Sequence, residues 1–281
     1  MSKSFTEMNE LNDSCVLVVD ALNLAFRFKH AKSTDFIDSY INLVESLKKS
    51  YKANRVIITC DQGSSSFRKG IYADYKANRT EKQALQTDQE REDFIAFFEE
   101  FNRTMDTISE LYPLLRFDKV EADDIAAYVV SALPKTATVW LISSDKDWDL
   151  LVNDRVSRFS YVTRKETTID NWEEHYDCTP EQYISIKCLT GDSGDNIKGV
   201  EGIGPKRAAD LVKQYGTVFD IIAELPIASK YKYITNLNAS KDILMLNCQL
   251  MDLVTYCEDA IGKDNIKIIN KVIEDLYAEW L

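Results

Sequence analysis

Histidine and closely spaced cysteines are scarce in this sequence, which limits the kinds of site it can form. Only two histidines occur, His30 and His175, and none of the six cysteines is spaced as CxxC. Zinc centres usually need such residues at short spacing, so we expect no zinc site. Because Cys15 and Cys60 fall in strand-like apolar runs, we expect free buried thiols and no disulfides.

Long apolar runs are also absent. Nothing approaches the roughly 20 apolar residues of a membrane-spanning helix, and the start MSKSFTEMNELNDS has no apolar segment of the kind found in signal peptides. Internal repeats and low-complexity segments are absent too. We therefore expect a cytoplasmic protein. The 281 residues, 45% of them hydrophobic, are enough for one large α/β domain and a smaller module.

The most informative feature that is present is a set of acidic residues. Three of them end apolar, β-branched runs: CVLVVD at Asp20, RVIITCD at Asp61 and TVWLISSD at Asp145. Such runs are typical of buried parallel strands, and open α/β sheets bind ligands beyond the carboxyl ends of their strands. Carboxylates gathered there suit Mg²⁺ or Mn²⁺. The full set is Asp20, Asp61, Glu121, Asp123, Asp124, Asp145, Asp147, Asp192 and Asp195.

Each acidic motif has an ordinary alternative explanation. In VEADDIAAYVV the acids could merely cap a helix, but three within four residues exceed what a cap requires. In SSDKDWDLL an EF-hand loop fails, because its Gly and Glu positions hold Leu150 and Val156. A haloacid-dehalogenase-like phosphatase is disfavoured because Asp20 is followed by Ala21 and Leu22. In TGDSGDN an Asx-turn alone would suffice.

The net charge of −12 at first disfavours a nucleic-acid partner. Leaving out the nine acids brings it to −3, so the acidity is concentrated in the predicted site, where metals would neutralise it. Elsewhere the chain has local basic stretches. Residues 64–82 carry five basic side chains against two acidic ones, and residues 155–165 carry four with no acid. Local fields of this kind decide what docks where.

The order of the apolar patterns predicts the organisation of the chain. Strand-like runs at 15–20 and 55–61 flank a helical pattern, giving a βαβ opening with a right-handed crossover. The polar, basic stretch that follows is too long for an ordinary connection. We predict an α/β domain over 1–179 with an insertion at about 62–112, a helical module over 180–240, and C-terminal helices over 241–281 that pack back on the first domain.

A second specific motif is GVEGIGPKRAADLV. Its glycines permit a tight turn, Pro205 can open the next helix, and the N–H groups of that helix can hold a phosphate beside Lys206 and Arg207. A helix corner with incidental basic residues is the plain alternative. The fuller pattern GVxGIGxKxA matches the helix-hairpin-helix motif, which grips a DNA backbone without distinguishing bases.

Seven segments, in this order along the chain, resemble the flap endonuclease / 5′→3′ exonuclease family, most closely its bacteriophage enzymes: VVDALNLAFRFKH, CDQG, YADYKANR, VEADDIAAY, LISSDKDWDLL, TGDSGDN and GVEGIGPKRA. The 5′-nuclease domain of bacterial DNA polymerase I is similar. The resemblance implies a PIN-like α/β fold with a mostly parallel sheet flanked by helices. It also implies a helical arch that a free 5′ end threads, and two or three divalent metals held by the nine carboxylates.

The resemblance also implies roles for basic and backbone groups. Lys76 and Arg79 match arch-base residues that act on the scissile phosphate, and with Asp145 they are the expected catalytic residues. Tyr75 could stack on a base or simply pack. A potassium ion would lie at Leu189, Thr190, Lys198, Val200 and Ile203. The expected DNA contacts are Arg27, Arg68, Lys69, Tyr75, Lys76, Arg79, Lys187, Gly202, Gly204, Lys206 and Arg207.

The predicted function is a structure-specific 5′-nuclease that cleaves DNA with 5′ flaps or free 5′ ends by two-metal-ion catalysis, in replication and repair. We expect a monomer, in the cytoplasm of a host cell if a phage encodes it. One alternative is a phage RNase H-type nuclease that prefers RNA–DNA hybrids. Another is a catalytically silent DNA-binding relative, which the complete set of acids disfavours because like charges facing DNA would weaken binding.

Overall fold

A six-stranded sheet forms the centre of the protein. The computed structural model describes residues 14–31, 33 and 35–278, so most of the segment for which we expect no signal peptide lies outside it. The sheet has the order β3-β2-β1-β4-β5-β6, and only the β5–β6 pair is antiparallel. The predicted α/β fold with a mostly parallel sheet is confirmed. The strands are β1 (Cys15–Asp20), β2 (Arg55–Cys60), β3 (Leu114–Arg116), β4 (Thr138–Ile142), β5 (Val156–Ser160) and β6 (Lys165–Thr167).

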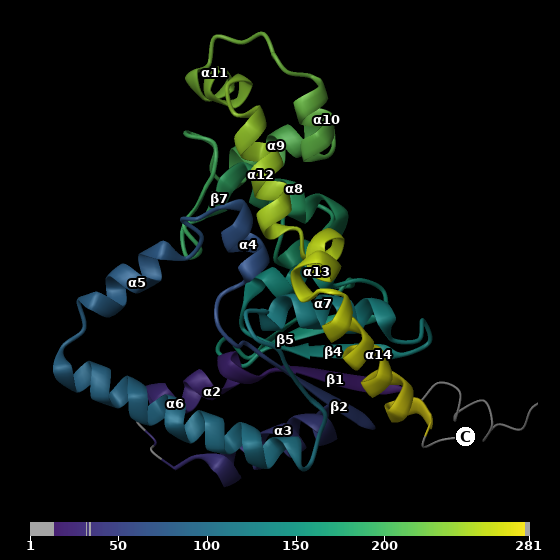
Figure 1. Cartoon of the computed structure of the whole chain (residues 1–281). Coiled ribbons are helices and arrows are strands. Elements are labelled where there is room, and N and C mark those ends of the chain that lie inside the picture. Colours follow the sequence, from purple (N-terminus) through teal and green to yellow (C-terminus); the bar gives the residue numbers. More distant parts are fainter. Residues whose placement is uncertain (1–13, 32, 34, 279–281) are drawn as a thin grey trace, which may run out of the picture.

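Helices cover both faces of this sheet (Figure 1). Successive side chains of a strand point to opposite faces, so Val16 and Val18 pack on one side of β1 while Leu17 and Val19 pack on the other, all fully buried. One face is covered by α2 (Ala21–His30), α3 (Ile37–Ser50) and α6 (Asp88–Ser109), and the other by α7 (Ala122–Ala132), α13 (Leu253–Ile261) and α14 (Lys263–Ala278).

Two predicted strands end earlier than expected. The strands β2 and β4 stop at Cys60 and Ile142, whereas we predicted them to continue to Asp61 and Asp145. The acids therefore stand on the turns just beyond the strands, where their side chains are not committed to a sheet face. Asp20 does end β1, and it also caps α2 by accepting a hydrogen bond from the Asn23 amide.

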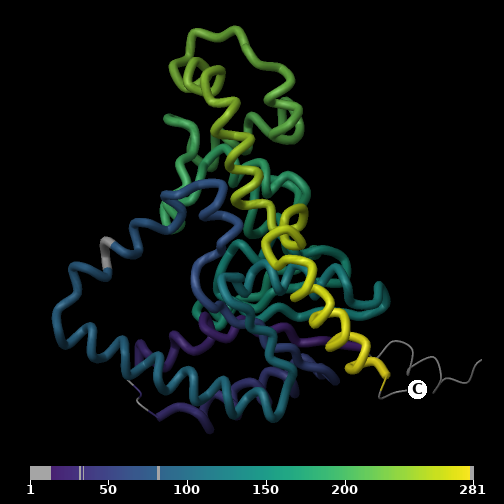
Figure 2. Tube along the Cα trace, in the orientation of Figure 1, coloured from purple at the N-terminus to yellow at the C-terminus, as the bar shows by residue number. Residues whose placement is uncertain are grey.

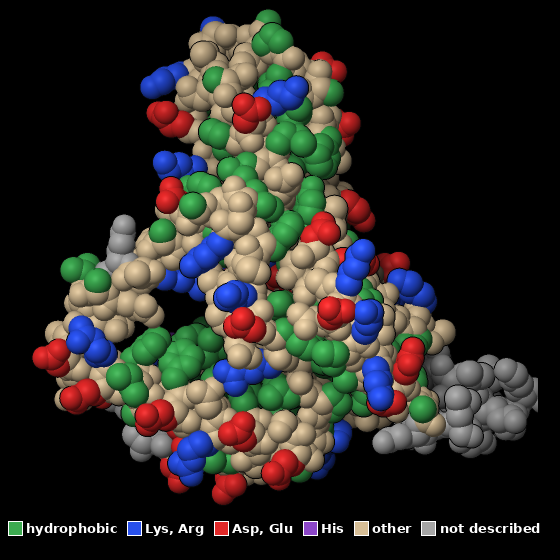
Figure 3. Space-filling model, viewed as in Figure 1, with side chains coloured by type: hydrophobic (Ala, Val, Ile, Leu, Met, Phe, Trp, Pro, Cys, Tyr) green, Lys and Arg blue, Asp and Glu red, His purple; other side chains and the backbone are tan. Residues whose placement is uncertain are grey.

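The insertion after β2 forms an arch. It consists of α4 (Ser66–Ile71), α5 (Ala77–Ala84) and the first half of α6, which leave the sheet and return to it (Figures 1 and 2). The arch encloses an opening that side chains do not fill in Figure 3. Apolar side chains here are exposed, with Leu85 at 84% and Ile95 at 51%. From Phe97 onward, α6 is buried against the sheet, through residues such as Phe101 and Met105.

The helical module has its own apolar core, to which α12 contributes Leu244, Cys248 and Leu250. The first turns of the C-terminal segment that we placed on the α/β domain therefore pack in the module, and only α13 and α14 return to the sheet. None of the described helices is long and apolar enough to cross a membrane. The module contains α8 (Pro180–Thr190), β7 (Gly191–Asp192), β8 (Ile197–Lys198), α9 (Pro205–Tyr215), α10 (Val218–Ala223), α11 (Lys232–Asn238) and α12 (Lys241–Met251).

The β7–β8 ribbon provides a test of backbone packing. A Cβ at Gly199 would lie 2.1 Å from the Thr190 carbonyl oxygen, whereas one at Gly204 would meet nothing within 4 Å. We expect Gly199→Ala to lower the free energy of unfolding by about 1–3 kcal/mol, because the backbone must move. Gly204→Ala is the matched control and should change the free energy of unfolding by only a few tenths of the Gly199→Ala effect. Urea unfolding measures both, and equal values would contradict this packing.

Candidate active site

The strand-end acids are held in place by short hydrogen bonds. Asp20 accepts from Ser143 Oγ at 2.7 Å through its second oxygen, and Ser143 Oγ in turn accepts from the Asp145 amide at 3.1 Å. Asp61 accepts from the Ala122 amide at 2.7 Å, which ties the end of β2 to the start of α7. Neighbouring strands and a helix start thus bring these acids to one edge of the sheet, as predicted.

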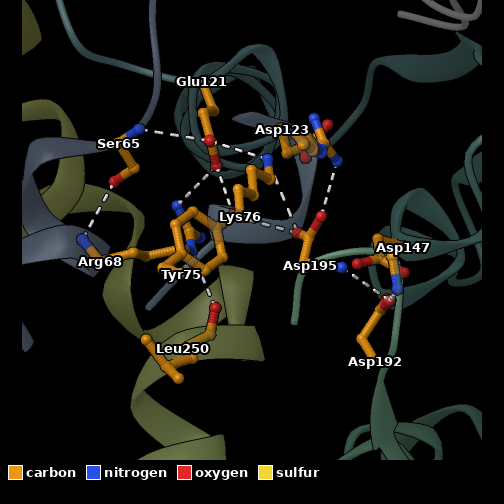
Figure 4. A network of polar contacts seen from close by, with 12 residues as sticks. Ser65, Arg68, Tyr75, Lys76, Glu121, Asp123, Asp147, Asp192, Asp195 and Leu250 are labelled. Carbon is orange, nitrogen blue, oxygen red and sulfur yellow. Dashed lines mark hydrogen bonds and ion pairs between the residues drawn. The ribbon is translucent and has the colours of Figure 1, made fainter. Parts of the chain in front are cut away.

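The acids at the start of α7 do not cap it. Glu121 is the N-cap residue, yet its side chain makes no capping bond. It accepts instead from the Ser65 amide, the Tyr75 hydroxyl and Lys76 Nζ (Figure 4). Asp123 accepts from the Trp148 indole at 2.6 Å. Helix capping therefore does not explain this cluster, because the carboxylates are directed at the arch base and the neighbouring 3₁₀ helix η1 (Lys146–Leu151).

Basic side chains link the remaining acids to the site. Lys76 Nζ lies 3.6 Å from Asp195, and Arg79 donates to the other oxygen of that carboxylate at 2.6 Å. Lys187 joins Asp147 and Asp192, at 2.5 and 3.7 Å. The Lys76 backbone has a φ of +56°, unusual for a residue with a side chain, and its N–H donates to the Asp195 carbonyl. The arch base is thus joined to the β7–β8 turn by backbone and side chain.

Burial and mutual repulsion set the protonation of these acids. Burial, and next the charge of Asp61, raise the pKa of Asp20 to about 8. Burial followed by Asp147 raises the pKa of Asp145 to about 6. Burial and then Asp145 raise the pKa of Asp123 well above its usual value. Protein groups alone therefore leave these carboxylates under-compensated.

The donor set fits a hard divalent cation. No set of three His, Cys, Asp or Glu side chains in the described part of the chain is already arranged to hold a metal ion. Lys76, Arg79 and Lys187 pair with four of the acids, which are Glu121, Asp147, Asp192 and Asp195. No described basic side chain forms an ion pair with the other strand-end and helix-start acids, which are Asp20, Asp61, Asp123 and Asp145. Oxygen ligands whose pKa values are raised by their neighbours are those that a bound cation would stabilise.

Asp124 and two expected DNA contacts lie in a buried cluster. Both oxygens of Asp124 accept from the Arg68 guanidinium, at 2.6 and 2.7 Å, and Arg68 also donates to the Leu250 carbonyl. Arg68 and Tyr75 are each only 2% exposed, and the Tyr75 hydroxyl contacts Glu121 and Asp195. The expectation that Arg68 and Tyr75 contact DNA is not supported: in this structure Tyr75 packs. Asp124 holds Arg68 through both of its oxygens, so a cation there would share them with the guanidinium.

The other expected DNA contacts differ in exposure. Lys187 is buried between two acids. The exposed ones are Arg27, Lys69, Arg79, Gly202, Gly204, Lys206 and Arg207. The Arg27 guanidinium lies 4.6 Å from the centre of the Tyr161 ring. Arg207 donates to the Gly202 carbonyl and lies over Tyr233.

The five positions expected to hold potassium come together where α8, the β7–β8 ribbon and the hairpin loop meet. The Val200 amide donates to the Leu189 carbonyl at 2.8 Å, and the Ile203 amide to the Val200 carbonyl. Lys198 pairs with Gly191, next to Thr190. Asn247, which belongs to no sequence motif, is buried in α12 and donates to the Cys188 and Lys198 carbonyls. It fixes the end of α8 to the ribbon.

The sequence also did not reveal a buried ion pair between η1 and β5. Asp149 and Arg158 are 1% and 5% exposed, and Arg158 additionally donates to the Ser143 carbonyl at 3.0 Å. This pair fixes η1, which carries Asp147, to β5. The sequence placed Arg158 in a basic stretch, where only its burial could have revealed a structural role.

Two profiles of one family match nearly the whole chain. Residues 15–177 match the 5′-3′ exonuclease N-terminal resolvase-like domain, and residues 178–272 match the 5′-3′ exonuclease C-terminal SAM fold. The chain belongs to the 5′-3′ exonuclease family. Membership accounts for the arrangement of acids, arch and helical hairpin in one chain, and it supports the family resemblance derived from the seven sequence segments.

Relatives support this family. The flap endonuclease of Escherichia phage T5 is 44% identical over 93% of this chain and 91% of its own length. A crystal structure of T5 D15 flap endonuclease in a complex with DNA and metal ions has a TM-score of 0.90 at 44% identity, covering 93% of this chain and 98% of that one. DNA polymerase I of Lactococcus lactis is 28% identical, and the match spans 31% of its length. The catalytic core of Rad2, 12% identical with a TM-score of 0.52, shares the fold.

The buried pair of Arg68 and Asp124 gives a stability prediction. Removing the cation alone leaves a buried carboxylate without a partner, so Arg68→Met should lower the free energy of unfolding by about 3–5 kcal/mol. Arg68→Met combined with Asp124→Leu removes both charges and should recover most of that loss. Urea unfolding of both variants measures the difference. A double variant no more stable than the single one would show that the unpaired charge is not the cause.

The raised pKa of Asp20 predicts how stability depends on pH without metal. The folded pKa is about 8 against an ordinary 3.8, so the folded chain retains a proton that the unfolded chain loses. The contribution of Asp20 to the free energy of unfolding is fully present below about pH 4 and is lost as the pH rises through 8. In chelator, Asp20→Asn should therefore gain stability over wild type between pH 5 and pH 9, by at least about 1.4 kcal/mol. The control is Asp106→Asn on α6, and a pH-independent difference for Asp20→Asn would refute the shift.

Proposed function

We propose that the chain is a metal-dependent, structure-specific 5′-nuclease, acting as a flap endonuclease and 5′→3′ exonuclease on DNA. The observation that carries this is the meeting of strand-end, helix-start and turn acids with the basic base of the arch. Lys76 Nζ lies 2.8 Å from Glu121 and 3.6 Å from Asp195. Such a site combines oxygen ligands for cations with side chains that can bind a phosphate, which is what phosphodiester hydrolysis needs.

We assign the cation-binding role to eight of the nine acids, and a supporting role to Asp124 because Arg68 occupies it. Two Mg²⁺ or Mn²⁺ ions, with a third as an option, would supply an activated water and neutralise charge on the leaving oxygen. The chain's own groups position the reaction. Ser143 orients Asp20, and the Trp148 indole orients Asp123. The metals in T5 relatives, zinc in one structure, support divalent binding here.

Lys76 and Arg79 have a double role in this proposal. In this structure they hold Glu121 and Asp195. When those carboxylates are neutralised by cations, the same two side chains are placed to hold the scissile phosphate. Lys187, buried between Asp147 and Asp192, would act in the same way on the opposite side of the site. These basic residues would therefore compensate the charge of the acids when no metal is bound, and would bind the phosphate when metal is bound.

DNA would approach from two directions. The single-stranded 5′ end would thread the opening under the arch, near Arg27 and Lys69, while the hairpin around Gly202 and Gly204 would grip duplex backbone with Lys206 and Arg207. A potassium ion held by backbone oxygens of Leu189, Thr190, Lys198, Val200 and Ile203 would support that grip. The T5 structure with DNA and metal ions supports DNA as the substrate. We propose that a monomer is active.

Product mapping on a labelled double-flap substrate tests the function. We expect cleavage near the flap junction and short products from free 5′ ends with Mg²⁺, and no cleavage in chelator. A bulky group on the 5′ end should reduce cleavage strongly if the end must thread the arch. Equal cleavage of blocked and free flaps would refute threading, and preference for an RNA–DNA hybrid over the flap would refute the substrate.

Asp145 is the most direct test of the metal assignment. We expect Asp145→Asn to lower kcat by at least about a thousandfold, because it removes a charged oxygen ligand of the cations. Flap binding in chelator should persist, because the substitution removes one charge and little volume. Asp106→Asn, on the exposed side of α6, is the control. Near-normal turnover of Asp145→Asn would exclude Asp145 from the cation-binding set.

A further inference from the structure

A small polar cavity lies next to the acids but is not formed by them. It has a volume of about 220 Å³ and opens between η1, β5, β6 and the segment around His175. Its lining includes Lys146, Lys165, His175, Ser160 and Thr163. Two positions place it beside the reaction: Ser144 and Lys146 line it, and both are neighbours of Asp145.

The charge of this cavity is positive. None of its lining side chains, all within the described residues, is acidic. Arg158 also lines it, but its guanidinium is already bound to Asp149, Ser143 and Thr167, so it forms a rigid wall. The available charge comes from Lys146 and Lys165, both exposed, and neither forms an ion pair with a described carboxylate.

The pleat of β6 explains why the positive charge faces inward. Side chains alternate along a strand, so Lys165 and Thr167 face the cavity while Glu166 between them faces the other way, where it accepts a hydrogen bond from the Tyr51 hydroxyl at 2.8 Å. A one-residue shift of register would exchange the lysine for the glutamate and reverse the charge. The β5–β6 pairing of Ser160 with Lys165 fixes that register.

We propose that this cavity binds a phosphate group of the DNA substrate, one that neighbours the phosphate at the acidic site. The inference rests on the proposed nuclease function and adds a contact to it. Ammonium groups and hydroxyls are suitable phosphate ligands, and the cavity lies beyond the carboxyl end of β4, where α/β sheets bind ligands. The acids would otherwise repel the strand on this side. The phosphate could be an internal diester or the 5′-terminal monophosphate, and the chemistry of recognition is the same.

The first test is equilibrium binding of 5′-flap DNA in chelator, where no cleavage occurs. We expect Lys146→Ala combined with Lys165→Ala to weaken binding about tenfold and to lower the slope of log affinity against log salt by about one. Lys263→Ala combined with Lys271→Ala removes the same charge from the exposed side of α14 and is the control. All four lysines are exposed, so folding should be unaffected, which thermal unfolding verifies.

The second test identifies the phosphate. Single neutral methylphosphonates are placed along the flap strand, and a 5′-hydroxyl end is compared with a 5′-phosphate end. At one position, replacing the phosphate should weaken DNA binding by the wild type but not by the variant with Lys146→Ala and Lys165→Ala. The neutral group in the DNA and the lysine substitutions in the protein would each remove the same contact, so their effects would not add. That position identifies the phosphate as internal or terminal. Additive losses at every position, or a cavity variant equal to the control, would overturn the proposal. Flap cleavage by the wild type with Mg²⁺ is scored separately, so failure of the nuclease function is distinguishable.

Discussion

Carboxylates that meet at one edge of a sheet repel one another, and much of the surrounding structure responds to that repulsion. Burial and neighbouring acids raise the pKa of Asp20 to about 8. Lys76, Arg79 and Lys187 compensate part of the charge, and they reach the site from the arch and from α8. The same requirement for positive charge therefore links three distant parts of the chain, and it is what a divalent cation would satisfy.

This linkage couples the arch to the catalytic edge. Lys76 lies at the base of the arch, just before α5, and its strained backbone is held by the Asp195 carbonyl while its side chain holds Glu121. Such strain persists only where surrounding contacts determine it. Binding of cations at the acids would change the partners of Lys76 and Arg79, so occupancy of the site and the conformation of the arch base should respond together. The outer part of the arch, with exposed Leu85 and Ile95, has few contacts that oppose such movement.

Two buried ion pairs mark the limits of what charge patterns predict. Arg68 and Arg158 both lie in stretches that look basic in the sequence, yet each is buried with its guanidinium on an aspartate, Asp124 and Asp149. The basic stretches therefore contribute fewer surface charges than their composition suggests. The positive charge that remains at the cavity beside β6 comes from Lys146 and Lys165. These lysines are exposed, unlike the buried Arg68.

The sequence by itself predicted the three central strands of a mostly parallel sheet, the order of the motifs and the family, because apolar β-branched runs, helical periodicity and the acids that follow them are local patterns. It did not predict the edge strand β3 or the order of the strands in the sheet. It also predicted that the strand-end acids would meet, since parallel strands share a carboxyl edge. Tertiary structure alone decided which acids remain available: Asp124 is bound by Arg68, while Ser143 and Trp148 orient Asp20 and Asp123. Those contacts join residues far apart in the chain, and their geometry follows from packing that no local pattern records.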